Sequence, residues 1–141
     1  MKVVLVTGGF DPVHSGHISY FESAKKLGDI LVVGLNSDEW LTRKKGKPFM
    51  SFTERLAILK ALYCVNYIIE FNDDNDTAIN ALEKVKERYP NDTIIFANGG
   101  DRTKENIPEL IVDGVNFAFN VGNEKTVSSS QLLQAWSESK Q

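Results

Sequence analysis

Cysteine and histidine are scarce in this sequence of 141 residues, which contains one Cys and two His. The single cysteine, Cys64, permits no disulfide within the chain, and so low a cysteine content is typical of a reducing compartment. We therefore expect a cytoplasmic protein. Cys64 lies in an apolar stretch, and we expect it to pack in the core.

Long apolar runs and a strong excess of one charge are also absent. The N-terminal apolar run ends at Gly8-Gly9 after about five residues, too short for a secretory signal peptide. Nothing approaches the roughly 20 apolar residues that a membrane span needs. With 16 Lys and Arg against 19 Asp and Glu, the net charge is −3, which offers no broad basic face to a phosphate backbone. We therefore expect neither a membrane nor nucleic acid as a partner.

The sequence does contain a regular alternation of β-branched runs with amphipathic segments. The runs predict five strands, at Lys2–Thr7, Ile30–Asn36, Asn66–Phe71, Thr93–Asn98 and Asn116–Val121. Their apolar composition indicates strands that are buried on both faces. Because no Pro-, Gly- or Ser-rich linker divides the chain, residues 1–141 are expected to form a single domain.

Helical patterns fill the intervals between these strands. They predict helices over about His17–Leu27, from Ser51 in a capping box with Glu54 to about Cys64, from Asp76 or Thr77 to before Pro90, over Lys104–Ile111, and from Ser128–Ser130 onward with Leu132, Leu133 and Trp136 facing inward. This alternation predicts an α/β fold: a Rossmann-like, doubly wound, parallel five-stranded sheet in three α/β/α layers.

Ligands of such sheets bind at the carboxyl ends of the strands, which here are followed by loops at 7–16, 36–49, 98–103 and 121–130. In the first loop, Gly8-Gly9 permits a close turn, and the helix that follows offers unpaired amides to an anion. His14 and His17 are three residues apart, which places both rings on one side of the helix start, and Gly16 leaves room for a phosphate. This loop therefore favours phosphate chemistry.

Three other interpretations of the first loop remain open from the residues alone. The histidines are structural, they belong to a metal site, or the glycines form a dinucleotide fingerprint. A metal site needs a third ligand, and no other His or thiol is nearby. The fingerprint lacks its glycine spacing, and the second strand ends in Asn36 where an acid would bind ribose.

The segment Gly9–His17, GFDPVHSGH, resembles the His-x-Gly-His signature of the cytidylyltransferase-like nucleotidyltransferases. The similarity covers most of the chain, continuing at Ala24–Asp29, Val33–Asp38, Glu54-Arg55, Asn98–Asp101 and Ser128–Ser130. The Asn-Ser-Asp and Gly-Gly-Asp segments look most like the heptose 1-phosphate adenylyltransferase domain, and glycerol-3-phosphate cytidylyltransferase is a more distant likeness.

This resemblance implies a nucleotidyltransferase. The phosphate of a small sugar or polyol phosphate would attack the α-phosphorus of ATP or CTP and expel pyrophosphate. Because that phosphate is already an anion, catalysis needs only to align the two substrates and to neutralise the charge that builds on the α-phosphoryl oxygens. The triphosphate brings Mg²⁺, and Asp11 is a candidate either to contact the metal or to stabilise a turn. The family is often dimeric, so we expect a homodimer.

The resemblance also implies roles for the residues of these loops. The expected catalytic residues are His14, His17, Lys44, Lys47 and Arg55. Asp38, Arg43 and Lys45 are expected to bind substrate, although the sequence does not rank Lys44, Lys45 and Lys47. The expected nucleotide-binding residues are Thr7, Gly8, Gly9, Phe10, Asp11, Gly16, Asn98, Gly99, Gly100, Asp101, Lys125, Ser128, Ser129 and Ser130.

Departures from the family pattern leave several questions open. Asn98 stands where the heptose-type enzymes tend to have a lysine, Arg102 replaces an aromatic residue, and Asn123 replaces an arginine of some relatives. A nucleotide-binding regulatory module without turnover and a dinucleotide oxidoreductase therefore remain alternatives. Trp40 flanks either a substrate or a dimer contact, and Asp73, Asp74 and Asp76 are expected to lie apart from the basic site.

Overall fold

The computed structural model of the chain describes residues 1–100, 107–122 and 129–139. Its strands form one parallel sheet in the order β3-β2-β1-β4-β5. They are β1 (Lys2–Gly8), β2 (Ile30–Leu35), β3 (Tyr67–Glu70), β4 (Thr93–Ala97) and β5 (Val115–Ala118). The chain moves outward from β1 in one direction through β2 and β3, and in the other through β4 and β5. The switch point therefore lies between the carboxyl ends of β1 and β4.

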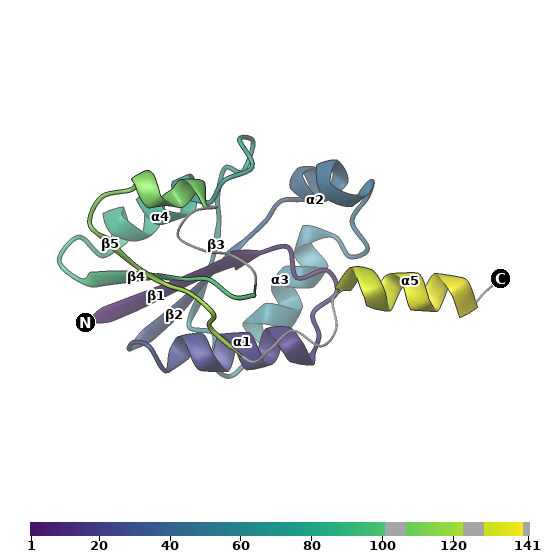
Figure 1. Ribbon diagram of the computed structural model, residues 1–141, viewed down its shortest axis with the longest axis horizontal. Coiled ribbons are helices and arrows are strands. Elements are labelled where there is room, and N and C mark those ends of the chain that lie inside the picture. Colours follow the sequence, from purple (N-terminus) through teal and green to yellow (C-terminus); the bar gives the residue numbers. More distant parts are fainter. Residues whose placement is uncertain (101–106, 123–128, 140–141) are drawn as a thin grey trace.

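Helices cover both faces of this sheet (Figure 1). The helices are α1 (Ser15–Lys25), α2 (Asp38–Lys45), α3 (Phe52–Lys60), α4 (Ile79–Arg88) and α5 (Ser129–Ser139), with one 3₁₀ turn, η1 (Pro108–Ile111). Helices α1 and α3 lie on one face, and α4 and η1 lie on the other. The predicted doubly wound, three-layer α/β/α fold is confirmed.

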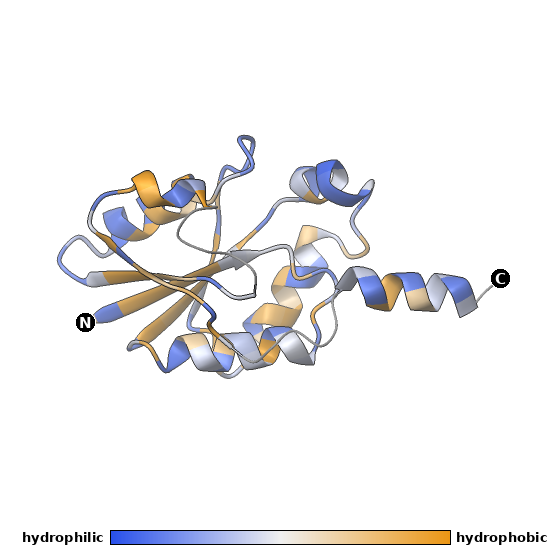
Figure 2. Cartoon of the chain, in the orientation of Figure 1, coloured by the Kyte–Doolittle hydropathy of each residue, from blue (hydrophilic) through white to orange (hydrophobic). Residues whose placement is uncertain are grey.

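The side chains of β1 alternate between two cores, as a strand buried on both faces requires. Val3 and Leu5 pack with α4, and Val4 and Val6 pack with α1 and α3. Figure 2 shows this apolar centre in the strands, with hydrophilic residues on the outer helix surfaces. Cys64 is buried in the second core, where burial raises the pKa of its thiol, although the residue follows α3 rather than belonging to it.

The edge strands correct one expectation. Not every strand is buried on both faces, because β3 exposes Tyr67 and Glu70, and β5 is only partly buried. An edge strand has a neighbour on one side only, and its segments are short. The fifth strand also ends at Ala118, three residues before the predicted Val121.

Helix α2 was not predicted, since its residues were assigned to the loop after the second strand. Its signals are nonetheless present in the sequence. The Ser37 side chain caps the helix by accepting a hydrogen bond from the Trp40 amide at 3.1 Å. Gly46 ends it with a φ of 94°, a conformation that favours glycine.

Helix α5 contradicts a second expectation. Leu132 and Trp136 do not face inward, because they are 40% and 60% exposed and no residue of α5 is buried in the described part of the chain. Figure 1 shows α5 running away from the sheet. Helical periodicity correctly places the apolar residues of α5 on one side of the helix. Whether another part of the protein covers that side depends on where the helix lies in the fold. No described helix is long and apolar enough to cross a membrane.

Candidate active site

The two histidines form the start of α1. His14 is the N-cap residue, and its Nδ1 accepts a hydrogen bond from the Gly16 amide at 3.0 Å. The amide of His14 donates in turn to Nδ1 of His17 at 3.3 Å, which completes a capping box built from imidazoles. The rings stack with their centroids 3.9 Å apart. Because each Nδ1 is an acceptor, the ring proton lies on Nε2, and each neutral imidazole has Nε2 as its donor.

Gly16 is required by the His14 ring. A Cβ on Gly16 would lie 2.9 Å from Cε1 and 3.1 Å from Nδ1 of His14. The sequence suggested that Gly16 leaves room for a phosphate, and the structure adds that it leaves room for the imidazole. The His-x-Gly-His spacing therefore has a local physical reason in the geometry of this helix start.

Replacing Gly16 by alanine should separate stability from activity. Gly16→Ala displaces the His14 ring, so we expect turnover to fall at least about tenfold. Alanine is the better helix former by up to about 1 kcal/mol, but the displaced His14 ring loses its cap hydrogen bond at a cost of about 1 kcal/mol, so the free energy of unfolding should change little. Denaturant unfolding and steady-state turnover of the same preparation measure both. A variant that is as active as the wild type would contradict this role of Gly16.

Phe10 connects the turn after β1 to this helix start. Its backbone is left-handed, with φ at 50°, and its ring is buried. The ring meets His17 edge-on at 5.0 Å and Phe21 at 4.9 Å between centroids. A non-glycine residue in this conformation must be held by its surroundings, and the packing against α1 provides that. The Gly8-Gly9 turn is thereby held next to both imidazoles.

Asp11 links this loop to the segment between α2 and α3. Its carboxylate, 2% exposed, accepts hydrogen bonds from the amides of Phe49 at 2.7 Å and Met50 at 2.6 Å. Lys45 Nζ lies 2.9 Å from the same carboxylate and donates to the Asp11 carbonyl at 2.6 Å. These contacts give Asp11 a structural role. In the described ranges, no cluster of three or more His, Cys, Asp or Glu could hold a metal ion.

Arg55 is fully buried and connects three loop ends. Its Nη1 donates to the carbonyls of Gly9 at 2.9 Å and Asn36 at 2.8 Å. Its Nε donates to the Met50 carbonyl at 3.0 Å, and Nη2 pairs with the Asp38 carboxylate at 2.7 Å. The fold engages the guanidinium through these contacts, so they make Arg55 a positioning residue for the ends of β1 and β2. The ion pair with Arg55 also engages the carboxylate of Asp38. A direct contact of Arg55 or Asp38 with the substrate remains a prediction.

The basic residues of α2 and of the loop after it contact different neighbours. Lys45 reaches Asp11, whereas Lys44 Nζ lies 4.7 Å from the ring centroid of Trp40. Arg43 pairs with Asp76 at 2.9 Å and donates to the Asp73 carbonyl at 2.7 Å. Lys44 and Lys47 are exposed, whereas Lys45 is half-buried. The position of Lys45 distinguishes it from the other two lysines.

The acidic segment after β3 does not lie apart from this basic run, contrary to expectation. Asp73 is 2% exposed and accepts hydrogen bonds from Asn36 Nδ2 at 3.0 Å and from the amide and hydroxyl of Ser37 at 2.8 and 2.7 Å. It therefore fixes the start of α2. Sequence reasoning missed this residue, because an aspartate among Asn and Asp resembles a solvated acid.

Asp73 should make stability depend on pH in the acid range. Burial by itself raises the pKa of this carboxyl, but the hydrogen bonds from Asn36 and Ser37 and the charge of Arg43 outweigh it and lower the pKa overall. A lowered folded-state pKa contributes stability that is fully present above the unfolded value of about 4 and is lost as the pH falls through the folded value. Asp73→Asn should therefore be less stable than the wild type at pH 7, with a gap that narrows below about pH 4. Denaturant midpoints across this range test it, and a constant gap would refute it.

The β4 side of the switch point holds fewer of the predicted groups. Asn98 is 2% exposed, and its Nδ2 donates to the carbonyls of Phe96 and Ala118, both at 3.3 Å, so its amide joins β4 to β5. Gly99 packs against Tyr20, and Gly100 is exposed. These positions can offer backbone groups to a base, whereas Asp101 and Arg102 lie outside the described residues.

The start of α5 returns to the histidine loop. Ser129 Oγ donates to the carbonyl of Pro12 at 2.7 Å. Ser130 is exposed in the same first turn, while Lys125 and Ser128 lie outside the described residues. The structure thus brings Ser129 to the loop that carries both histidines, although Ser129 and Pro12 are 117 positions apart in the sequence.

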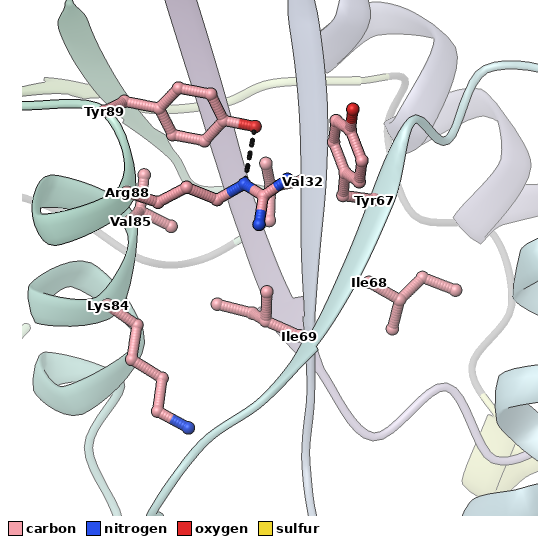
Figure 3. A pocket seen from close by; sticks show the side chains of 8 residues that line it. All are labelled: Val32, Tyr67, Ile68, Ile69, Lys84, Val85, Arg88 and Tyr89. Atoms are coloured by element: carbon pink, nitrogen blue, oxygen red, sulfur yellow. Dashed lines mark hydrogen bonds between the residues drawn. The ribbon is translucent and has the colours of Figure 1, made fainter.

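A cavity of about 80 Å³ lies elsewhere, between β3 and α4, as Figure 3 shows. Val32, Ile69 and Val85 line it, together with Arg88, whose Nε donates to the Tyr89 hydroxyl at 3.3 Å. The guanidinium of Arg88 lies 4.9 Å from the ring centroid of Tyr67. None of the predicted site residues lines this cavity. This cavity is therefore separate from the predicted site.

Comparison with known proteins agrees with this arrangement. Residues 5–135 match the family model described as cytidylyltransferase-like. The chain is 38% identical over 145 aligned residues to the bifunctional protein HldE of Geobacter sulfurreducens, covering 97% of this chain and 28% of that protein. It is 46% identical over 141 residues to HldE of Helicobacter acinonychis, with 97% and 29% covered. The chain thus spans less than a third of these relatives.

A solved structure shares both the fold and part of the sequence. The lipopolysaccharide core biosynthesis protein of Thermoplasma volcanium superimposes with a TM-score of 0.67 at 28% identity, covering 88% of this chain and 99% of that one. The family match extends over the histidine loop, the α2 segment, Arg55 and the β4 end, which the structure places at the carboxyl ends of β1, β2 and β4. The chain therefore belongs to the cytidylyltransferase-like family of nucleotidyltransferases.

Proposed function

We propose that this chain transfers a nucleoside monophosphate from ATP or CTP to the phosphate of a small sugar or polyol phosphate and releases pyrophosphate. The observation that carries the proposal is the imidazole capping box at the start of α1, next to the Gly8-Gly9 turn. Similarity to HldE and to heptose 1-phosphate adenylyltransferase domains supports a sugar phosphate as acceptor.

In this proposal the triphosphate lies over the turn after β1 and against the amino end of α1. That end offers backbone amides and the positive end of the helix dipole. His14 and His17 donate from Nε2 to phosphoryl oxygens and stabilise the charge that builds at the α-phosphorus. The bond from the acceptor phosphate oxygen to the α-phosphorus forms while the bond to pyrophosphate breaks, and no general base is required. Mg²⁺ would arrive with the triphosphate and neutralise its charge.

Lys45 is the lysine best placed to reach the phosphates. It already lies at the histidine loop through Asp11, whereas Lys44 lies on Trp40 and Lys47 is exposed. An ammonium on a flexible stem can exchange the Asp11 carboxylate for a phosphate oxygen when the substrate binds. The ion pair with Asp11 then serves as the resting contact of Lys45.

We expect Lys45→Gln to lower turnover at least about tenfold, because it removes a cation from the reacting phosphates. Lys44→Gln and Lys47→Gln are matched controls with the same change in charge, and each should stay within about threefold of the wild type. Single-turnover rates with saturating nucleotide provide the measurement. If Lys47→Gln is the most impaired of the three, the assignment moves to Lys47.

Pyrophosphate release tests the function directly. Each of ATP, CTP, GTP and UTP is paired with heptose 1-phosphate, hexose 1-phosphate and glycerol 3-phosphate, and thermal shift ranks nucleotide binding in parallel. One nucleotide should both stabilise the protein most and support release. Tight nucleotide binding without release in any pair would instead favour the regulatory module. Binding of NAD(P) in the same assay would favour the oxidoreductase.

A further inference from the structure

One edge of the sheet is formed by β3, which pairs with β2 only. The Glu70 carbonyl accepts a hydrogen bond from Lys84 Nζ at 2.7 Å, so it points away from β2. Because backbone groups alternate in direction along a strand, the N–H and C=O groups of Ile68 point away from β2 as well. Among the described residues, no group of a helix or loop donates to them or accepts from them. Strand β3 therefore offers backbone pairing to another extended chain.

The cavity between β3 and α4 lies beside this edge (Figure 3). Val32 and Val85 line its inner part and are 1% and 2% exposed, and Ile69 lines it from β3. Its volume of about 80 Å³ is roughly half that of an engineered apolar cavity that holds benzene, and it suits a branched aliphatic side chain. A side chain of an added strand that points to the α4 face would therefore meet an apolar pocket.

The two charged residues that line the cavity, Lys84 and Arg88, are both cations. Neither pairs with a carboxylate in the part of the chain that the structure describes. The Arg88 guanidinium lies 4.9 Å from the ring centroid of Tyr67 and 5.7 Å from that of Tyr89. These contacts hold the guanidinium in place, so it loses little further freedom when it binds an anion. The cavity therefore favours a ligand with negative charge.

The spacing of these cations matches the spacing of side chains on one face of a strand. Lys84 and Arg88 are four residues apart on α4, which corresponds to a rise of about 6 Å. Side chains two positions apart in an extended chain lie on the same face, about 6.6 Å from each other. An acidic residue two positions from an apolar residue would therefore reach a cation while the apolar side chain fills the cavity.

A second copy of the chain is the other possible occupant of this edge. A twofold axis at the edge would join β3 to β3 and place both α4 helices on the same face of the combined sheet. The Lys84 and Arg88 side chains of the two copies would then lie close together, and like charges repel each other. Charge therefore favours an acidic partner over a second copy.

We propose that β3 and the cavity beside it bind an extended, acidic segment of another protein, which adds a strand to the sheet. An apolar side chain of that segment fills the cavity, and an Asp or Glu two positions away pairs with Arg88 or Lys84. Backbone pairing with Ile68 supplies affinity, while the cavity and the cations select the sequence. None of the residues that line the cavity belongs to the predicted active site, so the proposal is independent of the transferase function.

The first test selects ligands from a displayed library of random heptapeptides. The library is passed over the wild-type protein and, in parallel, over a variant with Lys84→Glu and Arg88→Glu, two exposed positions at which the fold should persist. Peptides with Asp or Glu two positions from Leu, Ile or Val should be enriched at least about tenfold on the wild type relative to the variant. Circular dichroism verifies that the variant is folded. Absence of this enrichment would overturn the proposal.

Amide chemical shifts then locate the bound peptide. With the most enriched peptide made synthetically, the amide signals of Ile68 and Glu70 should shift to saturation, whereas those of the histidine loop should not. Arg88→Gln should raise Kd at least about threefold, because it removes a charge from the complex. Lys26→Gln is the matched control, since Lys26 is exposed at the end of α1, and it should leave Kd unchanged. Shifts confined to other elements would refute the site.

Methylated peptides test the backbone pairing. In an added strand, the N–H groups of alternate residues point toward β3 and away from it. Of two synthetic peptides methylated at alternate sets of amide nitrogens, one should therefore bind at least about tenfold more weakly than the other. Equal affinities would show that the peptide binds without adding a strand, and would contradict the proposal.

Two further measurements address the other occupants of this edge. Sedimentation of the wild type, alone and with the peptide, detects a second copy, and we expect no dimer that the peptide dissociates. Such a dimer would overturn the proposal, because β3 would already be paired. Inorganic phosphate in large excess should not displace the peptide, and complete displacement would reduce the site to a simple anion site and overturn the proposal as well.

Discussion

Removal of either imidazole is expected to lower turnover roughly a hundredfold or more while the fold persists, in His14→Ala as in His17→Ala. Each Nε2 would donate to charge that develops in the transition state, inside a site where such donors are fixed in advance. Pyrophosphate release at saturating substrate measures the loss, and circular dichroism with thermal unfolding verifies the fold. Turnover close to the wild-type value in either variant would contradict a catalytic role for that histidine.

A matched pair of substitutions separates capping from catalysis at this site. Asn is a good N-cap residue and Gln suits the third helical position of a capping box, so His14→Asn with His17→Gln rebuilds the box without imidazoles. The oxygens can accept the same two amide hydrogen bonds that the Nδ1 atoms accept now. We expect wild-type stability and the same loss of turnover. Full activity would show that the histidines serve only to cap α1.

Arg55→Met is expected to cost about 3 kcal/mol of unfolding free energy or more. Methionine replaces the aliphatic stem of the side chain but has no donor, so the carbonyls of Gly9, Asn36 and Met50 lose their guanidinium partner. An unsatisfied buried acceptor costs about 1–3 kcal/mol. Equilibrium unfolding in denaturant measures the difference, and a loss below about 1 kcal/mol would show that water replaces the guanidinium.

Asp38→Asn is the control for the ionic part of this network. Asp38 is 39% exposed, so solvent screens its pair with Arg55, and we expect a cost below about 1 kcal/mol. Arg55→Lys keeps the charge but lacks the planar fork that reaches several carbonyls, so its stability should fall between the two. If Arg55→Met does not fold, the order of Arg55→Lys and Asp38→Asn tests the same claim. Asp38→Asn costing more than Arg55→Lys would contradict it.

Much of the fold followed from local patterns. The strand starts at Lys2, Ile30 and Thr93 were predicted to the residue, because apolar runs bounded by polar segments mark buried parallel strands. The edge strands were predicted less well, since their exposure depends on their position in the sheet. Helix α2 was missed although Ser37 and Gly46 mark its ends, because its charged residues suggested a loop.

The residues of the candidate site were likewise only partly predictable from the sequence. The spacing of His14 and His17 identified the phosphate loop, and the structure supplied the reason for that spacing in the capping box. Lys44, Lys45 and Lys47 are equivalent in sequence, and only their placement favours Lys45. Asp73 and Glu109 carried no local signal, since their burial comes from segments far away in the chain.

The sequence by itself determined the parallel α/β fold, the family and the loop that carries the histidines, because period, capping and motif are properties of neighbouring residues. The tertiary structure decided which cations and acids meet, that α5 leaves its apolar stripe exposed, and that a cavity lined by two cations lies beside the edge strand β3. Those outcomes depend on how strands and loops distant in sequence are brought together, which no local pattern encodes.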